Sequence, residues 1–149
     1  MFNIALYQPD IPQNTAAIIR LCSCFNTTLE IIEPCGFYLN DKRLKRVAMD
    51  YLEKSKIITY KSYEDFLNKK KNSRIILMTT KAKKNYNNFK FNQKDTLLFG
   101  RESKGVPITV HKNAYQSLKI PLKKNARSLN VSMAVAITLS EALRQNYNL

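Results

Sequence analysis

Short runs of apolar residues alternate along this chain with longer segments in which apolar residues recur at helical spacing. Short apolar runs bounded by Gly, Pro and Asn are typical of strands. They predict strands at residues 2–7, 29–32, 57–60, 74–79, 96–99 and 118–121. The run at 74–79 is almost continuously apolar, so this strand is expected to be buried on both faces of a sheet.

Helices are predicted between these strands, starting at Pro12, after the capping residues Asp41 and Ser62, and at Val131, where the last helix runs to about residue 145. The residues expected to face the core are Ile18, Leu21, Cys22 and Phe25 in the first helix, Leu44, Val47 and Tyr51 in the second, Phe66 and Leu67 in the third, and Val131, Ala134, Val135, Leu139, Ala142 and Leu143 in the last. The polar stretch 81–94 is predicted to be an exposed loop. No repeat or linker divides the chain, so we predict a single α/β domain over residues 1–149 with a mostly parallel sheet.

Composition narrows the class of protein. With 149 residues and 44% hydrophobic residues, the chain is large enough for a core of its own. Three cysteines and one histidine do not suit a disulfide framework or a metal site, so we expect no metal and three reduced, mostly buried thiols. The N-terminus lacks the basic leader of a signal peptide, and no apolar run approaches the roughly 20 residues of a membrane span. These features predict a cytoplasmic protein without a membrane partner.

The charge balance points to a polyanionic partner. Lysine and arginine number 25 against 11 acidic residues, which gives a net charge of +14. Four cations fall within six residues of the predicted second helix, and these are Lys42, Arg43, Lys45 and Arg46. Helical spacing places three of them on one face, where they would suit contacts to phosphates; a merely solvated face is the alternative.

Ligands of open parallel sheets bind beyond the carboxyl ends of the strands. Here those ends are residues 7–9, Thr79-Thr80, residues 100–102 and Ile120-Pro121. Because the last three fall in the C-terminal half, the site is expected there. The two glycines of segment 100–105 do not complete a P-loop or a dinucleotide fingerprint, which leaves a backbone cradle for a ligand or a plain turn. Ser128 and Asn130 are candidate caps, which would aim the N-terminus of the last helix at the same strand ends.

An ordered set of segments carries a family resemblance. The segments are residues 3–15, 18–22, 32–37, 41–46, 50–51, 79–81, 98–102, 105–107, 120–121, 127–132 and 141–142. Over essentially its whole length the chain resembles the SPOUT superfamily of S-adenosylmethionine-dependent RNA methyltransferases. Within it, the chain is similar to the small tRNA 2′-O-methyltransferases that modify the wobble nucleotide, position 34, of leucine tRNAs.

The resemblance implies a fold, a cofactor and a set of residues. The fold would be an α/β sheet with helices on both faces and a deep C-terminal trefoil knot. S-adenosylmethionine would bind in the knot to Met78, Thr79, Gly100, Glu102, Gly105, Ile120, Ser128 and Leu129. Asn14 and Arg20 match the first motif of the family, whose members are homodimers in which this arginine approaches the methyl-transfer site. Since a guanidinium stays protonated, we expect Arg20 to stabilise the developing 2′-alkoxide or to hold a phosphate rather than to act as an ordinary base.

The chain departs from the family at several positions. It has Ala16-Ala17 where relatives have Gly-Asn, Arg101 in place of a proline, and Ser140 in place of a tyrosine. These departures leave the cofactor segments intact and bear on substrate choice and the dimer contact. The expected partners are the anticodon stem-loop of a tRNA and a second copy of the chain. The alternatives are another tRNA position or a ribosomal RNA as substrate, a non-catalytic RNA-binding module of the same fold, and a flavodoxin-like domain with a basic surface.

Overall fold

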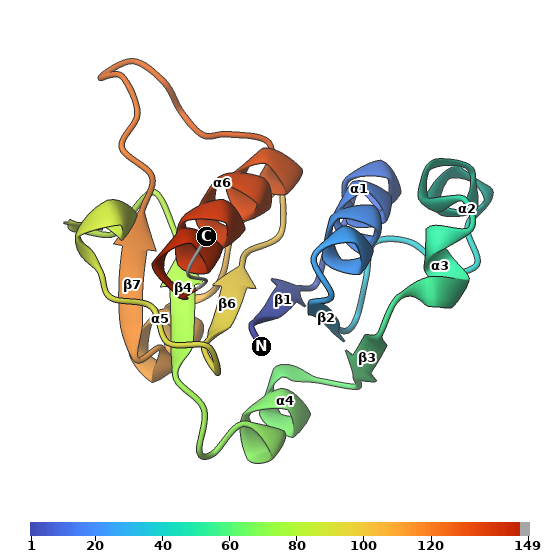
Figure 1. The fold of residues 1–149 in the computed structure, drawn as a ribbon, viewed down its shortest axis with the longest axis horizontal. Coiled ribbons are helices and arrows are strands. Elements are labelled where there is room, and N and C mark those ends of the chain that lie inside the picture. Colours follow the sequence, from blue (N-terminus) through green and yellow to red (C-terminus); the bar gives the residue numbers. More distant parts are fainter. Residues whose placement is uncertain (147–149) are drawn as a thin grey trace.

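Parallel strand pairing organises the fold. The computed structural model, which describes residues 1–146, contains one seven-stranded sheet in the order β3-β2-β1-β6-β4-β7-β5 (Figure 1). Every pairing in it is parallel. The strands are β1 Asn3–Tyr7, β2 Thr28–Ile32, β3 Ile57–Tyr60, β4 Ile75–Met78, β5 Lys84–Asn85, β6 Thr96–Phe99 and β7 Gln116–Lys119. The predicted mostly parallel α/β sheet is confirmed.

Helices cover both faces of this sheet, as crossover connections between parallel strands require (Figure 1). The helices are α1 Pro12–Cys24, α2 Lys42–Ala48, α3 Tyr51–Lys54, α4 Tyr63–Lys69, α5 Ile108–Asn113 and α6 Val131–Asn146, with a 3₁₀ turn at Tyr86–Asn88. Successive residues of β1 point to opposite faces. Ile4 and Leu6 join the core under α1, α2 and α6, whereas Ala5 joins the core under α4 and α5.

Burial of the central strands explains their sequence. All four residues of β4 and of β6, and all five of β2, are buried. A strand covered on both faces has no polar side, so it appears in the sequence as a continuous apolar run. The predicted burial of the fourth strand on both faces is therefore confirmed.

The segment 81–94 is not the exposed loop that its composition predicts. Two of its residues form β5 at the edge of the sheet, and Phe89 and Phe91 are buried. The backbone N–H of Phe91 donates to Oε1 of Gln145 at 2.9 Å, and Nε2 of Gln145 donates to the carbonyl of Phe89 at 3.0 Å. The segment thus packs against the end of α6, because two aromatic side chains among the polar residues supply its core contacts.

Other local predictions were wrong. The basic helix ends at Ala48, because Met49 adopts a φ of 51°, and Tyr51 belongs to the separate helix α3. Val47 and Phe25, both predicted to face the core, are exposed. Helix α5 was not predicted. The three cysteines are free, as expected, but only Cys22 is buried, while Cys24 is exposed and Cys35 is half-buried.

Candidate functional site

A cavity of about 450 Å³ opens at the carboxyl ends of β4, β6 and β7, where these strand ends meet the N-terminal ends of α1 and α6. Its volume lies within the range of about 300–1,000 Å³ that is usual for small-molecule sites. The lining residues are Ile11, Asn14, Met78, Thr79, Thr80, Phe99, Gly100, Arg101, Glu102, Gly105, Val106, Ile120, Leu122, Ser128, Leu129, Asn130, Val131 and Ala134. The location agrees with the strand-end rule.

Every residue predicted to bind a cofactor lines this one cavity, and so does Asn14. These residues come from four segments that are far apart in the sequence. The other predicted site residues, Arg20 on α1 and the four cations of α2, do not line it. Sequence reasoning did not identify Ile11 and Leu122 as wall residues, because a single apolar side chain outside a helix or strand carries no signal of its own, and it assigned Val131 to the core face of the last helix.

The loop after β6, residues 100–105, closes on itself. The backbone N–H of Arg101 donates to the carbonyl of Gly105 at 3.2 Å, and the N–H of Gly105 donates to the carbonyl of Arg101 at 2.9 Å. A Cβ atom on Gly100 would lie 2.8 Å from the carbonyl carbon of Gly105, so a glycine is needed at position 100. Gly105 has a φ of +65°, a region in which glycine is favoured. Both glycines therefore serve to fold the loop against the cavity.

Two carboxyl groups interlock beside this loop. The backbone N–H of Asp10 donates to Glu102 Oε2 at 2.9 Å, and the N–H of Glu102 donates to Asp10 Oδ1 at 3.1 Å. Burial raises the pKa of Glu102, and the neighbouring Asp10 carboxyl raises it further. Burial acts in the same sense on Asp10, but hydrogen bonds involving Glu102 and Ser103 and the charge of Arg101 outweigh it and lower the pKa of Asp10. The pair fastens the loop after β6 to the loop after β1 and leaves Glu102 facing the cavity.

Arg101, at a position where the family resemblance leads us to expect a proline, takes part in this arrangement. Its Nε lies 3.5 Å from Asp10 Oδ2, and its backbone N–H makes one of the two hydrogen bonds that close the loop. A proline has no N–H and could make neither contact. The departure therefore adds a loop-closing hydrogen bond and a cation at the cavity wall.

A chain of side-chain hydrogen bonds joins the three helix and loop ends around the cavity. Nδ2 of Asn14 donates to Glu102 Oε1 at 3.3 Å, and Oδ1 of Asn14 accepts from Nδ2 of Asn130 at 2.9 Å. Oδ1 of Asn130 in turn accepts from the backbone N–H of Ser132 at 2.9 Å and so caps α6. Asn130 is thus the cap of this helix, whereas Ser128, the other predicted cap, lies outside it. The side-chain amides of Asn14 and Asn130 each donate through Nδ2 and accept through Oδ1, so only one orientation of each amide makes both of its hydrogen bonds.

The connection from β7 to α6, residues 120–130, forms the open wall of the cavity. Within the described residues, the backbone N–H groups of Leu122, Ser128 and Leu129 donate no hydrogen bond to the protein. Backbone donors that lie beside a cavity and have no protein partner are available to a ligand. Together with the apolar side chains of Met78, Ile120 and Leu129, they suit a ligand with a flat heteroaromatic part.

Arg20 lies on the outer side of α1. Its side chain is exposed, and its guanidinium carbon lies 5.0 Å from the centre of the Tyr51 ring of α3. Arg20 thus lies on the polar side of the helix. Within one chain it faces solvent beside α3 rather than the cavity.

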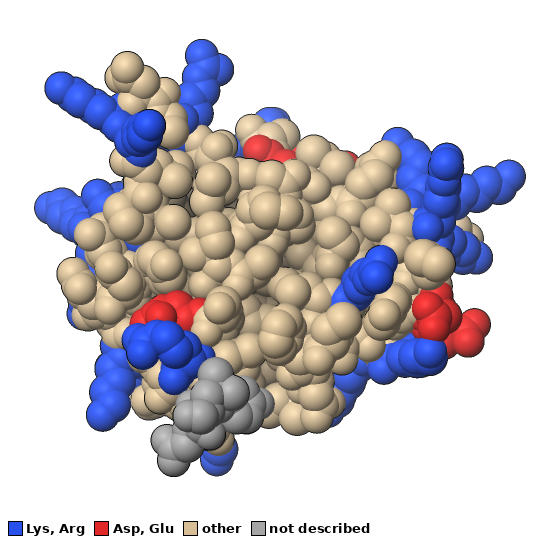
Figure 2. Space-filling model, turned by 45° about the horizontal axis from the view of Figure 1, so that its top comes forward, with Lys and Arg blue, Asp and Glu red and all other residues tan. Residues whose placement is uncertain are grey.

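The basic helix α2 presents its cations to solvent at the opposite end of the molecule from the β7–α6 connection (Figure 2). Asp41 caps the helix by accepting from the backbone N–H of Arg43 at 2.7 Å, as predicted. The same carboxylate binds the guanidinium of Arg43 through two bonds of 3.1 and 2.8 Å. Among the described residues, Lys42, Lys45 and Arg46 have no ion-pair partner, so they are more available to an anion than Arg43.

Residues 1–146 show neither a candidate metal site nor a candidate membrane span. No group of three or more His, Cys, Asp or Glu side chains lies close enough to hold a metal ion. Nor does any helix in this part of the chain combine the length and hydrophobicity needed to cross a membrane.

Comparison with known proteins assigns the family. The profile of the SpoU rRNA Methylase family matches residues 1–140. The chain belongs to this family. A tRNA (cytidine(34)-2′-O)-methyltransferase of Beijerinckia indica subsp. indica is 45% identical to this SpoU family member over 144 residues, 95% of this chain and 90% of the relative. The resemblance to SPOUT-type RNA methyltransferases expected from the sequence is confirmed.

Solved structures agree with this family. One, described as "Structural insights into the 2-OH methylation of C/U34 on tRNA", has a TM-score of 0.94 and 34% identity, and the match covers 97% of this SpoU family member and 95% of that chain. An AdoMet-bound rRNA methyltransferase from Sinorhizobium meliloti has a TM-score of 0.90 at 22% identity, covering 99% of this chain and 57% of that one, and so shares the fold. The deep trefoil knot stays a prediction.

Proposed function

We propose that this chain transfers the methyl group of S-adenosylmethionine to the ribose 2′-hydroxyl of nucleotide 34 of tRNA, in the cytoplasm. The observation that carries the proposal is the convergence of all eight predicted cofactor residues on one cavity. Relatives named for 2′-O-methylation of cytidine 34 and similar over nearly their whole length support the substrate. Leucine isoacceptors are the substrates to test first.

The cavity has the chemistry that S-adenosylmethionine needs. Free backbone N–H groups of the β7–α6 connection and apolar walls suit the adenine, and the Glu102 carboxylate suits the cationic part of the cofactor. When bound, the cofactor supplies a methyl group that its sulfonium already activates. The protein must then align the ribose oxygen with this methyl group and accept the hydroxyl proton. Asn14, fixed between Glu102 and Asn130, is placed to position the ribose.

A homodimer is the second part of the proposal. Arg20 lies outside the cavity of its own chain, so a role in methyl transfer requires that it reach the cavity of a second subunit. The face over α1 and α6 is suited to such contact, because it carries few charged residues between the two basic ends (Figure 2). Exposed apolar side chains on or next to these helices are Ile11, Phe25, Leu129, Met133 and Ile137. A face of this kind marks an interaction site.

In this dimer, Arg20 would stabilise the charge that develops on the 2′-oxygen. The free cations of α2, Lys42, Lys45 and Arg46, would hold phosphates of the anticodon stem-loop, which provides affinity without reading the sequence. Methylation of a ribosomal RNA or of another tRNA position is the alternative within the family, and a non-catalytic RNA-binding role is the alternative outside catalysis.

The decisive experiment is methylation of a complete tRNA pool with S-adenosylmethionine that carries a labelled methyl group, followed by mapping of the modified nucleotide. We expect label on the ribose of nucleotide 34. An anticodon stem-loop with a 2′-deoxyribose only at that nucleotide is the matched control, because it lacks the acceptor oxygen and should take up no label. Label at another nucleotide, or in ribosomal RNA instead, would replace the proposed substrate. Binding of cofactor and tRNA without transfer would support the non-catalytic alternative.

Arg20 is tested with mixed dimers. Arg20→Ala should lower kcat strongly while cofactor affinity stays nearly unchanged. Heterodimers of Arg20→Ala with a subunit defective at Gly100 contain one site that pairs a sound cavity with a sound arginine, so activity should partly return. Verified heterodimers without activity would refute action across the subunit boundary.

A further inference from the structure

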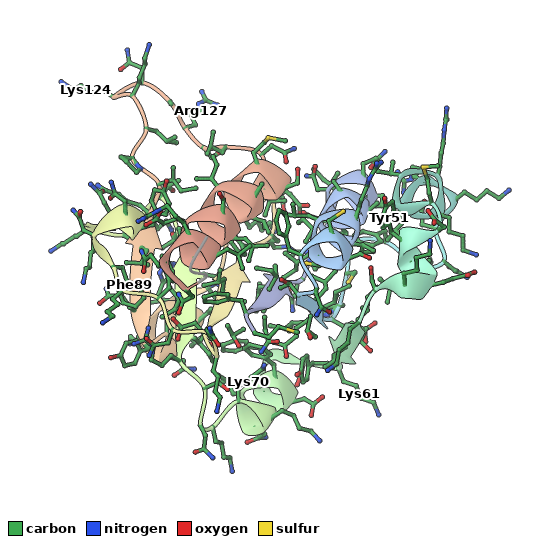
Figure 3. The ribbon with its side chains drawn as sticks, viewed as in Figure 1. Tyr51, Lys61, Lys70, Phe89, Lys124 and Arg127 are labelled. Carbon is green, nitrogen blue, oxygen red and sulfur yellow. The ribbon has the colours of Figure 1, made fainter. Side chains whose placement is uncertain are left out.

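A second basic surface lies at the end of the molecule opposite α2. The loop between β7 and α6 carries Lys123, Lys124 and Arg127, all exposed and none of them in an ion pair within the described residues. Figure 3 shows Lys124 and Arg127 on a loop that rises above β7 and α6 at the upper left of the view. Figure 2 shows the blue side chains of this end standing clear of the tan surface. We call these three cations the basic loop.

The basic loop has few contacts with the rest of the protein. One backbone hydrogen bond, from the N–H of Ala126 to the carbonyl of Lys123 at 2.9 Å, is found within residues 123–127. All five of these residues are exposed. Their charge therefore serves no packing or ion pairing that stabilises the described fold.

The chain offers these cations no anionic neighbours in the sequence. Residues 103–140 contain no Asp or Glu, although they contain five lysines and one arginine. A solvated face normally mixes both signs of charge, because like charges repel each other. A long stretch that carries only positive charge indicates a negatively charged partner. Because the whole chain has a net charge of +14, this partner is a polyanion.

The loop is also continuous with the cavity. Ile120 and Leu122 precede the basic loop, Ser128 and Leu129 follow it, and all four line the cavity. A polyanion held by the basic loop thus lies directly beside the place where the cofactor is expected to bind. Helix α2 with its cations, by contrast, lies at the opposite end of the molecule (Figure 1).

We propose that the basic loop binds the phosphates of the RNA strand that flank the nucleotide being methylated. This inference rests on the proposed function and adds a second RNA contact to α2. Phosphate contacts fix the position and orientation of a nucleic acid without reading its bases. A grip next to the cavity would therefore align the target ribose, whereas α2 would add affinity for a more distant part of the stem-loop.

The test is a salt titration of the binding of a fluorescent 17-nucleotide anticodon stem-loop to the full-length protein. The variant combines Lys123→Gln, Lys124→Gln and Arg127→Gln. The matched control combines Lys61→Gln, Lys69→Gln and Lys71→Gln, which removes the same charge from exposed positions around α4, at the opposite side of the structure from the basic loop (Figure 3). Each lost phosphate contact lowers the slope of log K against log salt by about 0.7–0.9.

Three lost contacts should therefore lower this slope by about 2 and weaken binding about 100-fold at 0.1 M salt, with the difference fading near 1 M. In the methylation assay KM should rise and kcat should fall, because the bound RNA loses the grip that aligns its ribose, while the affinity for S-adenosylmethionine stays unchanged. The control should change much less. Equal slopes for the variant, the control and the wild type would overturn the inference, as would a wild type that does not bind the stem-loop.

The two proposals fail in different ways. A wild type that transfers no methyl group to nucleotide 34 refutes the proposed function, whatever the basic loop does. An active wild type whose loop variant keeps its KM and its salt slope refutes the inference alone.

Discussion

Adding a single methyl group at Gly100 should weaken cofactor binding by forcing open the loop at residues 100–105. A Cβ atom there would lie 2.8 Å from the carbonyl carbon and 2.9 Å from the Cα of Gly105. Ordinary contact begins near 3.4 Å, so the two ends of the loop must separate by about 0.6 Å. Because both close neighbours are backbone atoms, no side chain can rotate away to relieve the clash. The φ of Gly100 is not in the left-handed region, so the effect of Gly100→Ala is steric.

The magnitude follows from the hydrogen bonds at risk. Two backbone bonds between Arg101 and Gly105 close the loop, and each contributes about 0.5–1.5 kcal/mol. If Gly100→Ala must restore the closed loop before the cofactor binds, the free energy of cofactor binding becomes less favourable by about 1–3 kcal/mol. This corresponds to about 5- to 150-fold weaker binding. The loop lies at the end of β6 and outside the buried strands, so the global free energy of unfolding should fall by no more than the same amount.

Isothermal titration with S-adenosylmethionine measures the effect, and urea denaturation checks that the variant is folded. Lys104→Ala in the same loop is the matched control, because this residue is exposed and makes no side-chain hydrogen bond or ion pair in the described structure. Unchanged affinity in a folded Gly100→Ala variant would mean that the closed loop is not part of the cofactor site. A comparable loss in Lys104→Ala would refute the steric argument.

Two further predictions concern charge. Lys70 forms an ion pair with Glu30, whose side chain is only 2% exposed. Lys70→Met leaves this buried carboxylate without its cation, so it should lower the free energy of unfolding, measured by urea denaturation, by about 3–5 kcal/mol. Lys69→Met, a control at an exposed position, should stay within about 0.5 kcal/mol of wild type. Hydrogen bonds from Arg43 lower the pKa of Asp41 to about 2, and in Arg43→Gln this pKa, followed by carboxyl NMR, should return toward 3.8. In the wild type, the contribution of this carboxylate to stability is therefore present above pH 3.8 and is lost as the pH falls through about 2. Equal denaturation midpoints or an unchanged titration would contradict the respective pairing.

The sheet could be predicted from the sequence because burial on both faces leaves a direct signature. Strands such as β4 and β6 contain almost only apolar residues, and helical spacing marks α1 and α6. Segments whose structure depends on one or two contacts were missed. Phe89 and Phe91 anchor an otherwise polar stretch, and the positive φ of Met49 ends α2 within a sequence that favours a longer helix.

The site was predictable to the extent that it depends on strand ends. The strand-end rule identified three loops, and the family resemblance added Asn14, but neither shows how the loops are joined. The link between Asp10 and Glu102 spans 92 residues, and the link between Asn14 and Asn130 spans 116. A contact between positions so far apart leaves no periodicity in a single sequence, so only the folded chain reveals it.

The distribution of charge fits the two partners that the proposed reaction brings together. The chain carries +14 overall, yet the carboxylate of Glu102 lines the cavity, and the carboxylate of Asp10 accepts a hydrogen bond from the backbone N–H of Glu102 beside it. A cationic cofactor would be repelled by the net charge of the protein, and an acidic group at close range offsets this repulsion where the cofactor binds. The cations of α2 and of the basic loop lie on the surface at opposite ends of the molecule. There they can attract the phosphates of an RNA within about 10 Å, the distance over which salt leaves charges unscreened. If the proposed function holds, replacing Glu102 should therefore weaken binding of the cofactor and not that of the stem-loop, whereas neutralising the basic loop should do the reverse. In the proposed function, this separation would let one strongly basic chain bind a cation and a polyanion.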